Sequence, residues 1–321
     1  MNESSQIQAG IILGAATRIS PYINRTPVIT SHTLNRLFES QIFFKCENFQ
    51  KVGAFKARGA TNAVLLLDQQ QLSSGVATHS SGNHAQALSW AASLVNSKAY
   101  IVMPENSSKI KVAAVRDYGG IITFCEPTLQ ARESTLASIL EKTGAIEIHP
   151  YNDERIIAGQ ATAALELIEE IKNLDIIMAP VGGGGLLSGT SLSAHYFRPE
   201  AKVIAAEPEQ AADAFRSFTN QKFIPSENPQ TIADGLRTSL GSITFPIILR
   251  HVHQIVTVNE ESIVTAMRLI WERMKIIVEP SAAVPVAALL EKKTNIKGKR
   301  VGIILSGGNV DLDELPWRKY E

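Results

Sequence analysis

Four consecutive glycines, residues 182–185, directly follow the apolar run 176–181 and directly precede Leu186, where a helix can begin. Each glycine in a regular element costs roughly 0.5 to 1 kcal/mol relative to alanine, so the run implies an opposing gain on the order of 2 to 4 kcal/mol. A strand that turns into a helix through bare backbone presents free N–H groups and the positive end of the helix dipole, which suit a phosphate. A close-packed tight turn is the other explanation, and the loop by itself leaves both open.

The composition excludes several classes of protein. The length of 321 residues suggests about two domains. Lysine plus arginine balance aspartate plus glutamate at 31 each, so no net field attracts nucleic acid or an anionic membrane. The first residues lack the pattern of a secretion signal, and no apolar run approaches the ~20 residues of a membrane span. We therefore expect a cytoplasmic protein that binds neither nucleic acid nor membranes.

Short apolar or β-branched runs alternate with helical patterns along the whole chain. Helix-face spacing appears, for example, over residues 60–67 and 84–95. The runs that read as strands are 42–46, 76–79, 99–103, 121–124, 176–181, 203–206, 255–258 and 301–305. This alternation predicts an α/β fold with mostly parallel, open sheets and helices on both faces.

Three of the predicted strands end in loops rich in glycine and small polar residues. These loops are 80–84, 182–185 and 306–309. Ligands of open α/β sheets bind at the carboxyl edge of the strands, so we expect the three loops to meet at one cleft. A dinucleotide-binding fold is the rival interpretation, but the glycine run is not a G-x-G-x-x-G fingerprint, and Glu207 about 20 residues later is a weak match to its acidic residue.

Lys56 lies at the start of a predicted helix that continues to Leu67. A helix N-terminus and the nearby cations Lys51 and Arg58 both disfavour an ammonium group, which favours the neutral amine that forms a Schiff base. A solvated surface lysine is the alternative, and the local sequence does not separate the two.

Taken together, four motifs in this order resemble the pyridoxal-phosphate enzymes of the tryptophan synthase β-like fold, fold type II. The motifs are Ala54-Phe55-Lys56-Ala57-Arg58-Gly59, Ser80-Ser81-Gly82-Asn83-His84-Ala85-Gln86, the glycine run and Ser306-Gly307-Gly308-Asn309. The resemblance covers essentially the whole chain and is closest to serine/threonine dehydratases and serine racemases. It implies a large cofactor-binding domain of residues 1–66 and 150–321, and a small inserted substrate-binding domain of residues 67–149.

The resemblance also implies the cofactor contacts. Lys56 would form the Schiff base with pyridoxal 5'-phosphate, Phe55 would pack against the ring, Asn83 would bond the ring hydroxyl and Ser306 would face the pyridine nitrogen. The residues implied to hold the phosphate are Gly182, Gly183, Gly184, Gly185 and Leu186. A serine beside the pyridine nitrogen makes a weaker electron sink than an aspartate, which favours loss of a β-leaving group over a long-lived carbanion.

The expected reaction is β-elimination from a hydroxy amino acid. Lys56 would remove the α-proton and the β-hydroxyl would leave, so that L-threonine or L-serine gives a 2-oxo acid and ammonia. The helix start in the second motif offers free N–H groups to the substrate α-carboxylate. The substrate-binding residues expected there are Ser80, Ser81, Gly82, Asn83 and His84.

Ser81 leaves a second activity open. Many catabolic threonine dehydratases have alanine at the matching position, whereas the matching serine of serine racemases can carry a second proton. Serine racemase, with dehydration as a side reaction, is therefore one alternative. The plainer interpretation is that Ser81 binds the carboxylate or caps the helix.

Arg132 leaves the substrate open. It matches a substrate-contacting arginine of the racemase-like subgroup, so threo-3-hydroxyaspartate, with its second carboxylate, is another candidate substrate. A solvated helix arginine is the plainer interpretation. A pyridoxal-phosphate-binding regulatory protein without activity is the non-enzyme alternative, and the presence of Lys56, Asn83 and Ser306 disfavours it.

The segment 207–213 resembles the divalent-cation loop of the family, with the Glu207 and Asp213 carboxylates and the Ala211 carbonyl as ligands. Oxygen ligands suit Mg²⁺ or Ca²⁺. An acidic helix start after a strand is the alternative.

The resemblance also implies a homodimer and raises ATP as an effector. The positions that match an ATP site are Lys51, Gln86, Lys111 and Asn309, while Val52 replaces a threonine of that pattern.

Overall fold

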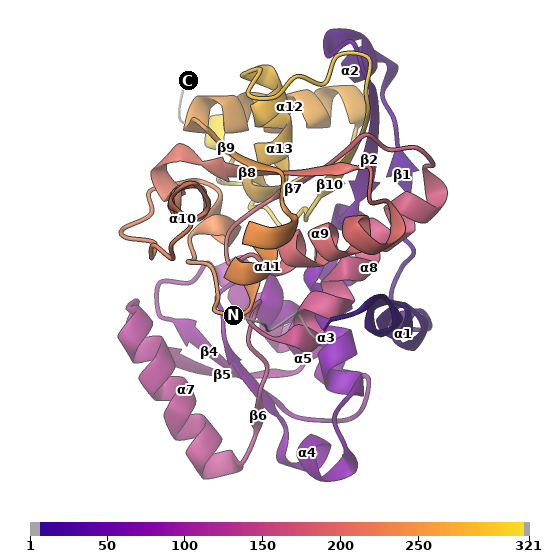
Figure 1. Ribbon diagram of the computed structural model, residues 1–321. Coiled ribbons are helices and arrows are strands. Elements are labelled where there is room, and N and C mark those ends of the chain that lie inside the picture. The colour runs from indigo at the N-terminus through magenta and orange to yellow at the C-terminus, as the bar shows by residue number, and fades with distance from the viewer. Residues whose placement is uncertain (1–6, 318–321) are drawn as a thin grey trace.

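The structure, a computed structural model, describes residues 7–317 and contains a six-stranded and a four-stranded sheet (Figure 1). The strand orders are β1-β2-β10-β7-β8-β9 and β5-β4-β3-β6, and every neighbouring pair is parallel except β1 with β2. The larger sheet contains β1 (Val28–Ile29), β2 (Gln41–Cys46), β7 (Ile176–Pro180), β8 (Lys202–Pro208), β9 (Gln254–Val258) and β10 (Arg300–Leu305). The smaller sheet contains β3 (Val76–His79), β4 (Ala99–Pro104), β5 (Gly120–Cys125) and β6 (Ile146–Glu147).

Helices occupy most of the chain between the strands. They are α1 (Ala9–Ile19), α2 (His32–Leu37), α3 (Lys56–Leu65), α4 (Gln69–Ser74), α5 (Asn83–Ser93), α6 (Lys109–Asp117), α7 (Leu129–Thr143), α8 (Glu154–Glu170), α9 (Gly185–Phe197), α10 (Asp213–Asn220), α11 (Thr244–His251), α12 (Glu260–Met274) and α13 (Pro280–Leu290). Short 3-10 turns are η1 (Glu47–Phe49), η2 (Lys51–Gly53), η3 (Glu209–Ala211) and η4 (Asp234–Leu236).

The α/β fold with parallel sheets is confirmed. All eight predicted strands are present, while β1 and β6 were not predicted because two residues are too few to show a hydrophobic pattern. The strands of the smaller sheet all come from residues 76–147. The domain boundaries themselves stay a prediction.

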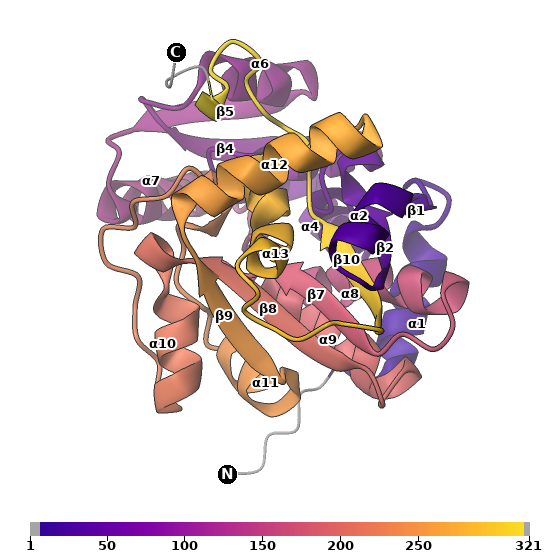
Figure 2. The same cartoon turned by 90° about the horizontal axis from the view of Figure 1, so that it is seen from above.

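Helices cover both faces of each sheet because successive strand side chains point to opposite sides. On β7, Ile176 and Met178 pack into a core with α12 and α13, and Ile177 packs into a second core with α8 and α9. Figure 2 shows α12 and α13 over the first of these faces. In the smaller sheet, Ile101 packs with α5 and α3, while Val102 packs with α7 on the opposite face.

Helix α8 touches both α3 and α9 through glycines. A Cβ atom on Gly159 of α8 would lie 2.6 Å from Cα of Gly59 in α3, and one on Gly189 of α9 would lie 2.6 Å from the backbone nitrogen of Ala161 in α8. The backbones are therefore in direct contact. Because α3 begins at Lys56 and α9 begins at the end of the glycine run, α8 sets the positions of both.

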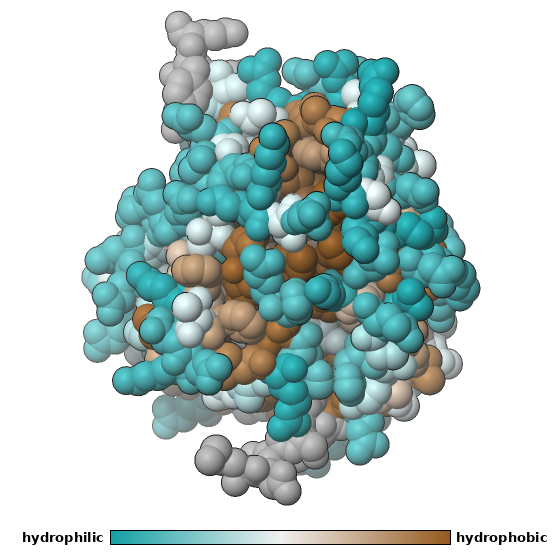
Figure 3. Space-filling view, turned by 45° about the horizontal axis from the view of Figure 1, so that its top comes forward, coloured by the Kyte–Doolittle hydropathy of each residue, from teal (hydrophilic) through white to brown (hydrophobic). Residues whose placement is uncertain are grey.

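Within residues 7–317 no helix is long and apolar enough to cross a membrane. Polar side chains cover most of the face shown in Figure 3, and its apolar surface is concentrated near the middle.

The glycine contacts predict opposite effects for two glycine-to-alanine substitutions. Gly159→Ala forces α3 and α8 apart and should lower the free energy of unfolding by about 1 to 3 kcal/mol. Gly14→Ala in α1 places its Cβ in open space, so it should raise stability by about 0.5 to 1 kcal/mol through helix propensity. Urea denaturation of both variants measures the difference. Equal effects would contradict the direct contact between the helices.

Candidate active site

Lys56 is the first residue of α3, and its amine is largely withdrawn from solvent. The Nζ atom donates a hydrogen bond to the carbonyl of Pro150 at 2.7 Å and lies 5.1 Å from the ring centroid of Phe55. Burial lowers the pKa of Lys56 to about 8, against the opposing charge of Glu279. The amine therefore loses its proton more readily than an ordinary lysine.

The expected cause of this lowered pKa was wrong. The sequence pointed to Lys51 and Arg58, but the main cause is burial. Lys51 is exposed, and the Arg58 guanidinium binds the carboxylates of Glu47 and Glu166 instead of facing the amine.

Backbone hydrogen bonds attach the segment before Lys56 to the loop that carries Ser306. The N–H of Phe55 donates to the carbonyl of Ser306 at 3.0 Å, and the N–H of Gly308 donates to the carbonyl of Gly53 at 2.9 Å. Ser306 is buried. The loop 306–309, one of the three predicted loops, therefore lies beside the segment that leads into Lys56.

The amide of Asn83 is held from both sides. Its Oδ1 accepts a hydrogen bond from Asn309 at 2.9 Å, and its Nδ2 donates to the two carboxylate oxygens of Glu279 at 2.9 and 3.1 Å. Burial raises the pKa of Glu279 to about 7. The loop after β3 therefore meets the Ser306 loop through side chains at the amino end of α5.

The glycine run is both close-packed and open at its backbone. A Cβ on Gly183 would overlap the ring of Tyr151, one on Gly182 would lie 2.8 Å from Cα of Leu236, and Gly184 has φ of +89°. Within residues 7–317 the N–H groups of residues 182–184 donate no hydrogen bond, and α9 begins without a side-chain cap. The tight-turn explanation accounts for the missing side chains, and the free N–H groups fit a phosphate.

The start of α5 fits a carboxylate in the same way. No side chain caps this helix, the Ser80 hydroxyl accepts only from the N–H of Gly82, and the half-buried Ser81 hydroxyl makes no hydrogen bond to the described residues. His84 is buried against the carbonyl of Ile148, and its pKa falls to about 3, chiefly by burial. His84 is therefore neutral near pH 7 and adds no positive charge. The features that would attract an anion here are the N–H groups of the helix start and the helix dipole.

Arg132 on α7 is only partly exposed. Its Nε is buried and has no hydrogen-bond partner among the described residues. Its charge, after burial, also lowers the pKa of His79. The rings of His79, His149 and Tyr151 follow one another edge to face, at 6.4 and 4.6 Å, from the side of Arg132 toward the glycine run.

The three residues of the predicted cation loop lie close to one another at the end of β8. Glu207 and Asp213 are fully buried, and the Glu207 oxygens accept from the N–H groups of Ala214 and Phe215 at 3.0 and 2.8 Å. The two oxygens of Asp213 make no hydrogen bond of ordinary geometry within residues 7–317. Burial and their mutual repulsion raise the pKa of Glu207, and burial raises that of Asp213 to about 6. In the described part of the chain no three His, Cys, Asp or Glu side chains group as metal ligands, so a cation here would also need the carbonyl of Ala211.

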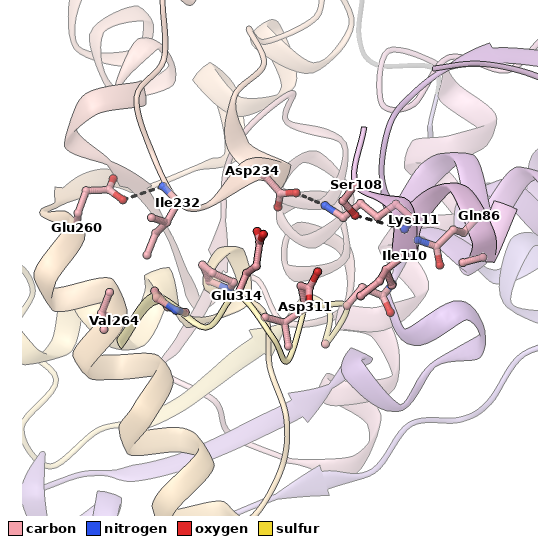
Figure 4. Close-up of a pocket in the computed structure, with 16 residues that line it drawn as sticks. Gln86, Ser108, Ile110, Lys111, Ile232, Asp234, Glu260, Val264, Asp311 and Glu314 are labelled. Atoms are coloured by element: carbon pink, nitrogen blue, oxygen red, sulfur yellow. Dashed lines mark hydrogen bonds and ion pairs between the residues drawn. The ribbon is translucent and has the colours of Figure 1, made fainter. Parts of the chain in front are cut away.

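A cavity of about 490 Å³ lies between α5 and α6 on one side and α12, the start of α13 and residues 308–316 on the other (Figure 4). Three of the residues that matched an ATP site, Gln86, Lys111 and Asn309, line it, while the exposed Lys51 does not. Its Lys111 is paired with Asp234. The other carboxylates of the lining are Glu260, Asp311 and Glu314.

The sequence analysis missed Glu279, Tyr151 and the carbonyl of Pro150. Glu279 and Tyr151 lie in no motif with a recognisable spacing, and a backbone carbonyl carries no signal in the sequence at all. Pro150 and Tyr151 reach the site because they precede α8, which packs against α3, and Glu279, which precedes α13, reaches it by accepting the hydrogen bond from Asn83.

Comparisons with known proteins agree with this geometry. The family model "Pyridoxal-phosphate dependent enzyme" matches residues 19–307. The chain is 53% identical over 306 residues to the beta-hydroxyaspartate dehydratase of Paracoccus denitrificans, covering 95% of this chain and 97% of the relative. It is 50% identical to the serine racemase of Dictyostelium discoideum over 94% of each chain. The solved structure of maize serine racemase superimposes with a TM-score of 0.94 at 43% identity, covering 98% and 97% of the two chains.

These matches cover nearly the whole chain, and the parallel sheets, the lysine at the start of α3 and the open glycine run are all in place. The chain belongs to the pyridoxal-phosphate dependent enzymes of fold type II, in the group of serine racemases, hydroxyaspartate dehydratases and threonine deaminases.

Proposed function

We propose that the protein is a dehydratase of 3-hydroxyaspartate, which loses water and yields oxaloacetate and ammonia. The observation that carries this choice of substrate is the buried, unpartnered Nε of Arg132 near the ring of His79. The similarity to a beta-hydroxyaspartate dehydratase supports it. Both favour this alternative over the dehydration of threonine or serine that the sequence analysis put first.

The residues of the site have distinct roles in this proposal. The open N–H groups of the glycine run and Leu186 would hold the cofactor phosphate, Phe55 would pack on the ring, Asn83 would bond the ring hydroxyl and Ser306 would face the pyridine nitrogen. When bound, pyridoxal phosphate withdraws electrons from the α-carbon of the amino acid attached to it, which makes the α-proton removable.

Lys56 would move that proton. Because burial brings the pKa of its Nζ to about 8, the amine can take up a proton and release it again near neutral pH. The free N–H groups from Ser81 to His84 would hold the α-carboxylate, and Arg132 would hold the second carboxylate.

Removing the Arg132 charge should separate the two classes of substrate. In Arg132→Gln, kcat/KM for 3-hydroxyaspartate should fall about 10- to 100-fold through loss of a charged hydrogen bond. The value for serine, which has no second carboxylate, should change less than about 3-fold. Oxaloacetate and pyruvate are quantified with both diastereomers of 3-hydroxyaspartate and with L-serine. The exposed Arg116 of α6 provides the matched control, Arg116→Gln, and Lys56→Ala gives the blank without the base.

Equal loss with both substrates would contradict the role of Arg132. Turnover of serine or threonine but not of 3-hydroxyaspartate by the unmodified protein would contradict the proposed substrate. No turnover of any of these amino acids would favour the regulatory, non-enzymatic alternative.

Serine racemase is the second candidate, and the free hydroxyl of Ser81 favours it. Because the Ser81 hydroxyl makes no hydrogen bond to the described residues, it is available to exchange a proton with a substrate. A serine racemase is also among the similar relatives. If Ser81 is the second base, Ser81→Ala should lower D-serine formation at least about 10-fold more than pyruvate formation. Chiral chromatography and a pyruvate assay on the same samples measure both rates. An equal loss of both products would indicate carboxylate binding instead.

We propose that Mg²⁺ or Ca²⁺ binds Glu207, Asp213 and the carbonyl of Ala211. Without a cation, the raised pKa of Asp213 means that the folded state binds more protons than the unfolded state. The contribution of Asp213 to stability is therefore fully present below about pH 4 and is lost as the pH rises from about 4 through 6. A divalent cation replaces the lost protons, so its stabilisation should grow over the same range.

The rise in Tm on adding Ca²⁺ or Mg²⁺ should therefore be larger at pH 7.5 than at pH 5, as measured by differential scanning fluorimetry. Asp213→Asn should abolish most of this rise, whereas the exposed Asp117→Asn of α6 should not. A cation effect that is the same at both pH values, or that survives in Asp213→Asn, would contradict the site.

ATP as an effector and a homodimer are also proposals. The position of Gln86, Lys111 and Asn309 at one cavity supports an ATP site there. The four carboxylates of the lining, against one paired lysine, favour the magnesium complex over free ATP.

A further inference from the structure

A network of buried charges lies around Arg58, two residues after Lys56 in α3. It contains two cations, Lys45 and Arg58, and two carboxylates, Glu47 and Glu166, so its formal charge is zero. Lys45, Glu47 and Arg58 are completely buried, and the Glu166 side chain is 12% exposed. Lys45 binds Glu166 at 2.6 Å and the carbonyl of Thr26 at 2.7 Å. None of these four residues has a role in the proposed reaction.

Arg58 is the centre of this network and uses all five of its N–H groups. Nε and one terminal nitrogen donate to the two oxygens of Glu47 at 2.7 and 2.9 Å. Both terminal nitrogens donate to the two oxygens of Glu166 at 2.7 and 2.8 Å, and one donates to the Thr162 hydroxyl at 3.1 Å. Only a guanidinium offers this planar, two-sided fork, because a lysine has three donors on one point.

The network joins three elements that meet at Lys56. Glu47 is in η1 at the end of β2, Arg58 is in the first turn of α3, and Thr162 and Glu166 are in α8. Further hydrogen bonds hold α3 on α8: the N–H of Gly59 donates to Gln160 at 3.2 Å, and Asn62 donates to the carbonyl of Arg155 at 2.7 Å. Since α3 has no side-chain cap at its start, Arg58 is the main anchor of its first turn.

The position of α8 also fixes the groups that Lys56 must meet. The chain enters α8 from Pro150, whose carbonyl accepts the hydrogen bond from the lysine amine. On its other side, α8 contacts α9, which follows the glycine run. The angle and distance between α3 and α8 therefore determine where the amine lies relative to the free N–H groups of the glycine run.

We propose that Arg58 is a positioning residue of the reaction, which fixes α3 on α8 and thereby holds the Lys56 amine at the place where it meets the aldehyde of the bound cofactor. The proposal rests on the proposed role of Lys56 but not on the choice of substrate. A purely stabilising role is the alternative, because a buried ion pair can contribute to stability without any function.

Two variants weaken the network to different degrees, and a third is a matched control. Thr162→Val removes one acceptor of Arg58, together with the hydrogen bond that this hydroxyl donates to the carbonyl of Gly159 at 2.6 Å, and retains the shape of the side chain. Arg58→Lys retains the charge but loses the two-sided fork. Thr61→Val makes the same isosteric change on α3 itself, at a buried hydroxyl that has no hydrogen-bond partner among the described residues.

The first measurement is the rate at which each apoprotein forms an imine with pyridoxal phosphate, followed by visible absorbance. In this step Nζ of Lys56 attacks the aldehyde carbon, the C=N bond forms and water leaves, so no substrate is needed. The second is the affinity for pyridoxine 5'-phosphate, which has the ring and the phosphate but no aldehyde and therefore reports on binding alone. Urea denaturation gives the stability of each variant.

We expect imine formation to slow about 3- to 10-fold in Thr162→Val and about 100-fold in Arg58→Lys, because a small misplacement of a reacting group costs that much. The affinity for pyridoxine 5'-phosphate should stay within about 2-fold of the unmodified protein, since the glycine run is intact. Thr61→Val should match the unmodified protein in both measurements.

The proposal is overturned if Thr162→Val forms the imine as fast as Thr61→Val, or if imine formation and pyridoxine 5'-phosphate affinity fall by the same factor. Should Arg58→Lys fail to fold, the comparison of the two valine variants decides alone. Failure of the unmodified protein to dehydrate 3-hydroxyaspartate would overturn the proposed function and leave this measurement unaffected.

Discussion

The close contact between α3 and α8 is the constraint on which the site depends. The two helices touch backbone to backbone at Gly59 and Gly159, and the guanidinium of Arg58 holds them together from within a buried, charge-neutral network. Larger side chains at the glycines would separate the helices, and a shorter or less branched cation would leave buried carboxylates without donors. Everything that Lys56 reaches follows from this contact.

The same arrangement lowers the pKa of the Lys56 amine without a cation beside it. The amine is buried between the Phe55 ring and the carbonyl of Pro150, and burial is the main reason for its lowered pKa. The negative charge of Glu279 raises the pKa of Lys56 and so opposes burial. Burial also raises the pKa of Glu279, to about 7, so that this carboxyl gains and loses its proton near neutral pH. The site therefore contains two groups that titrate near neutral pH, produced by desolvation more than by direct charge pairing.

The two proposed anion sites are made of backbone rather than of charged side chains. The glycine run and the start of α5 both offer N–H groups at uncapped helix starts, and the nearby His84 is neutral. Backbone N–H groups bind a phosphate or carboxylate regardless of the rest of the molecule, so they give little selectivity between substrates. Among the described residues, the Nε of Arg132 is the one buried cationic nitrogen without a hydrogen-bond partner, and we therefore propose that a choice between substrates depends on Arg132.

The sequence by itself determined the fold class, the order of the strands along the chain, the glycine run and the lysine. These features follow from local patterns. Periodicity indicates strands and helices, and a sequence motif can be recognised without knowing the tertiary structure around it. The roles of the individual site residues, the cation, ATP and the dimer stay predictions. The tertiary structure alone decided that burial and not Arg58 lowers the pKa of Lys56, that the Nε atom of Arg132 is buried, and that Glu279 and Tyr151 lie beside the residues of the site. Each of these depends on which side chains from distant segments exclude water from one another, and no local pattern records that.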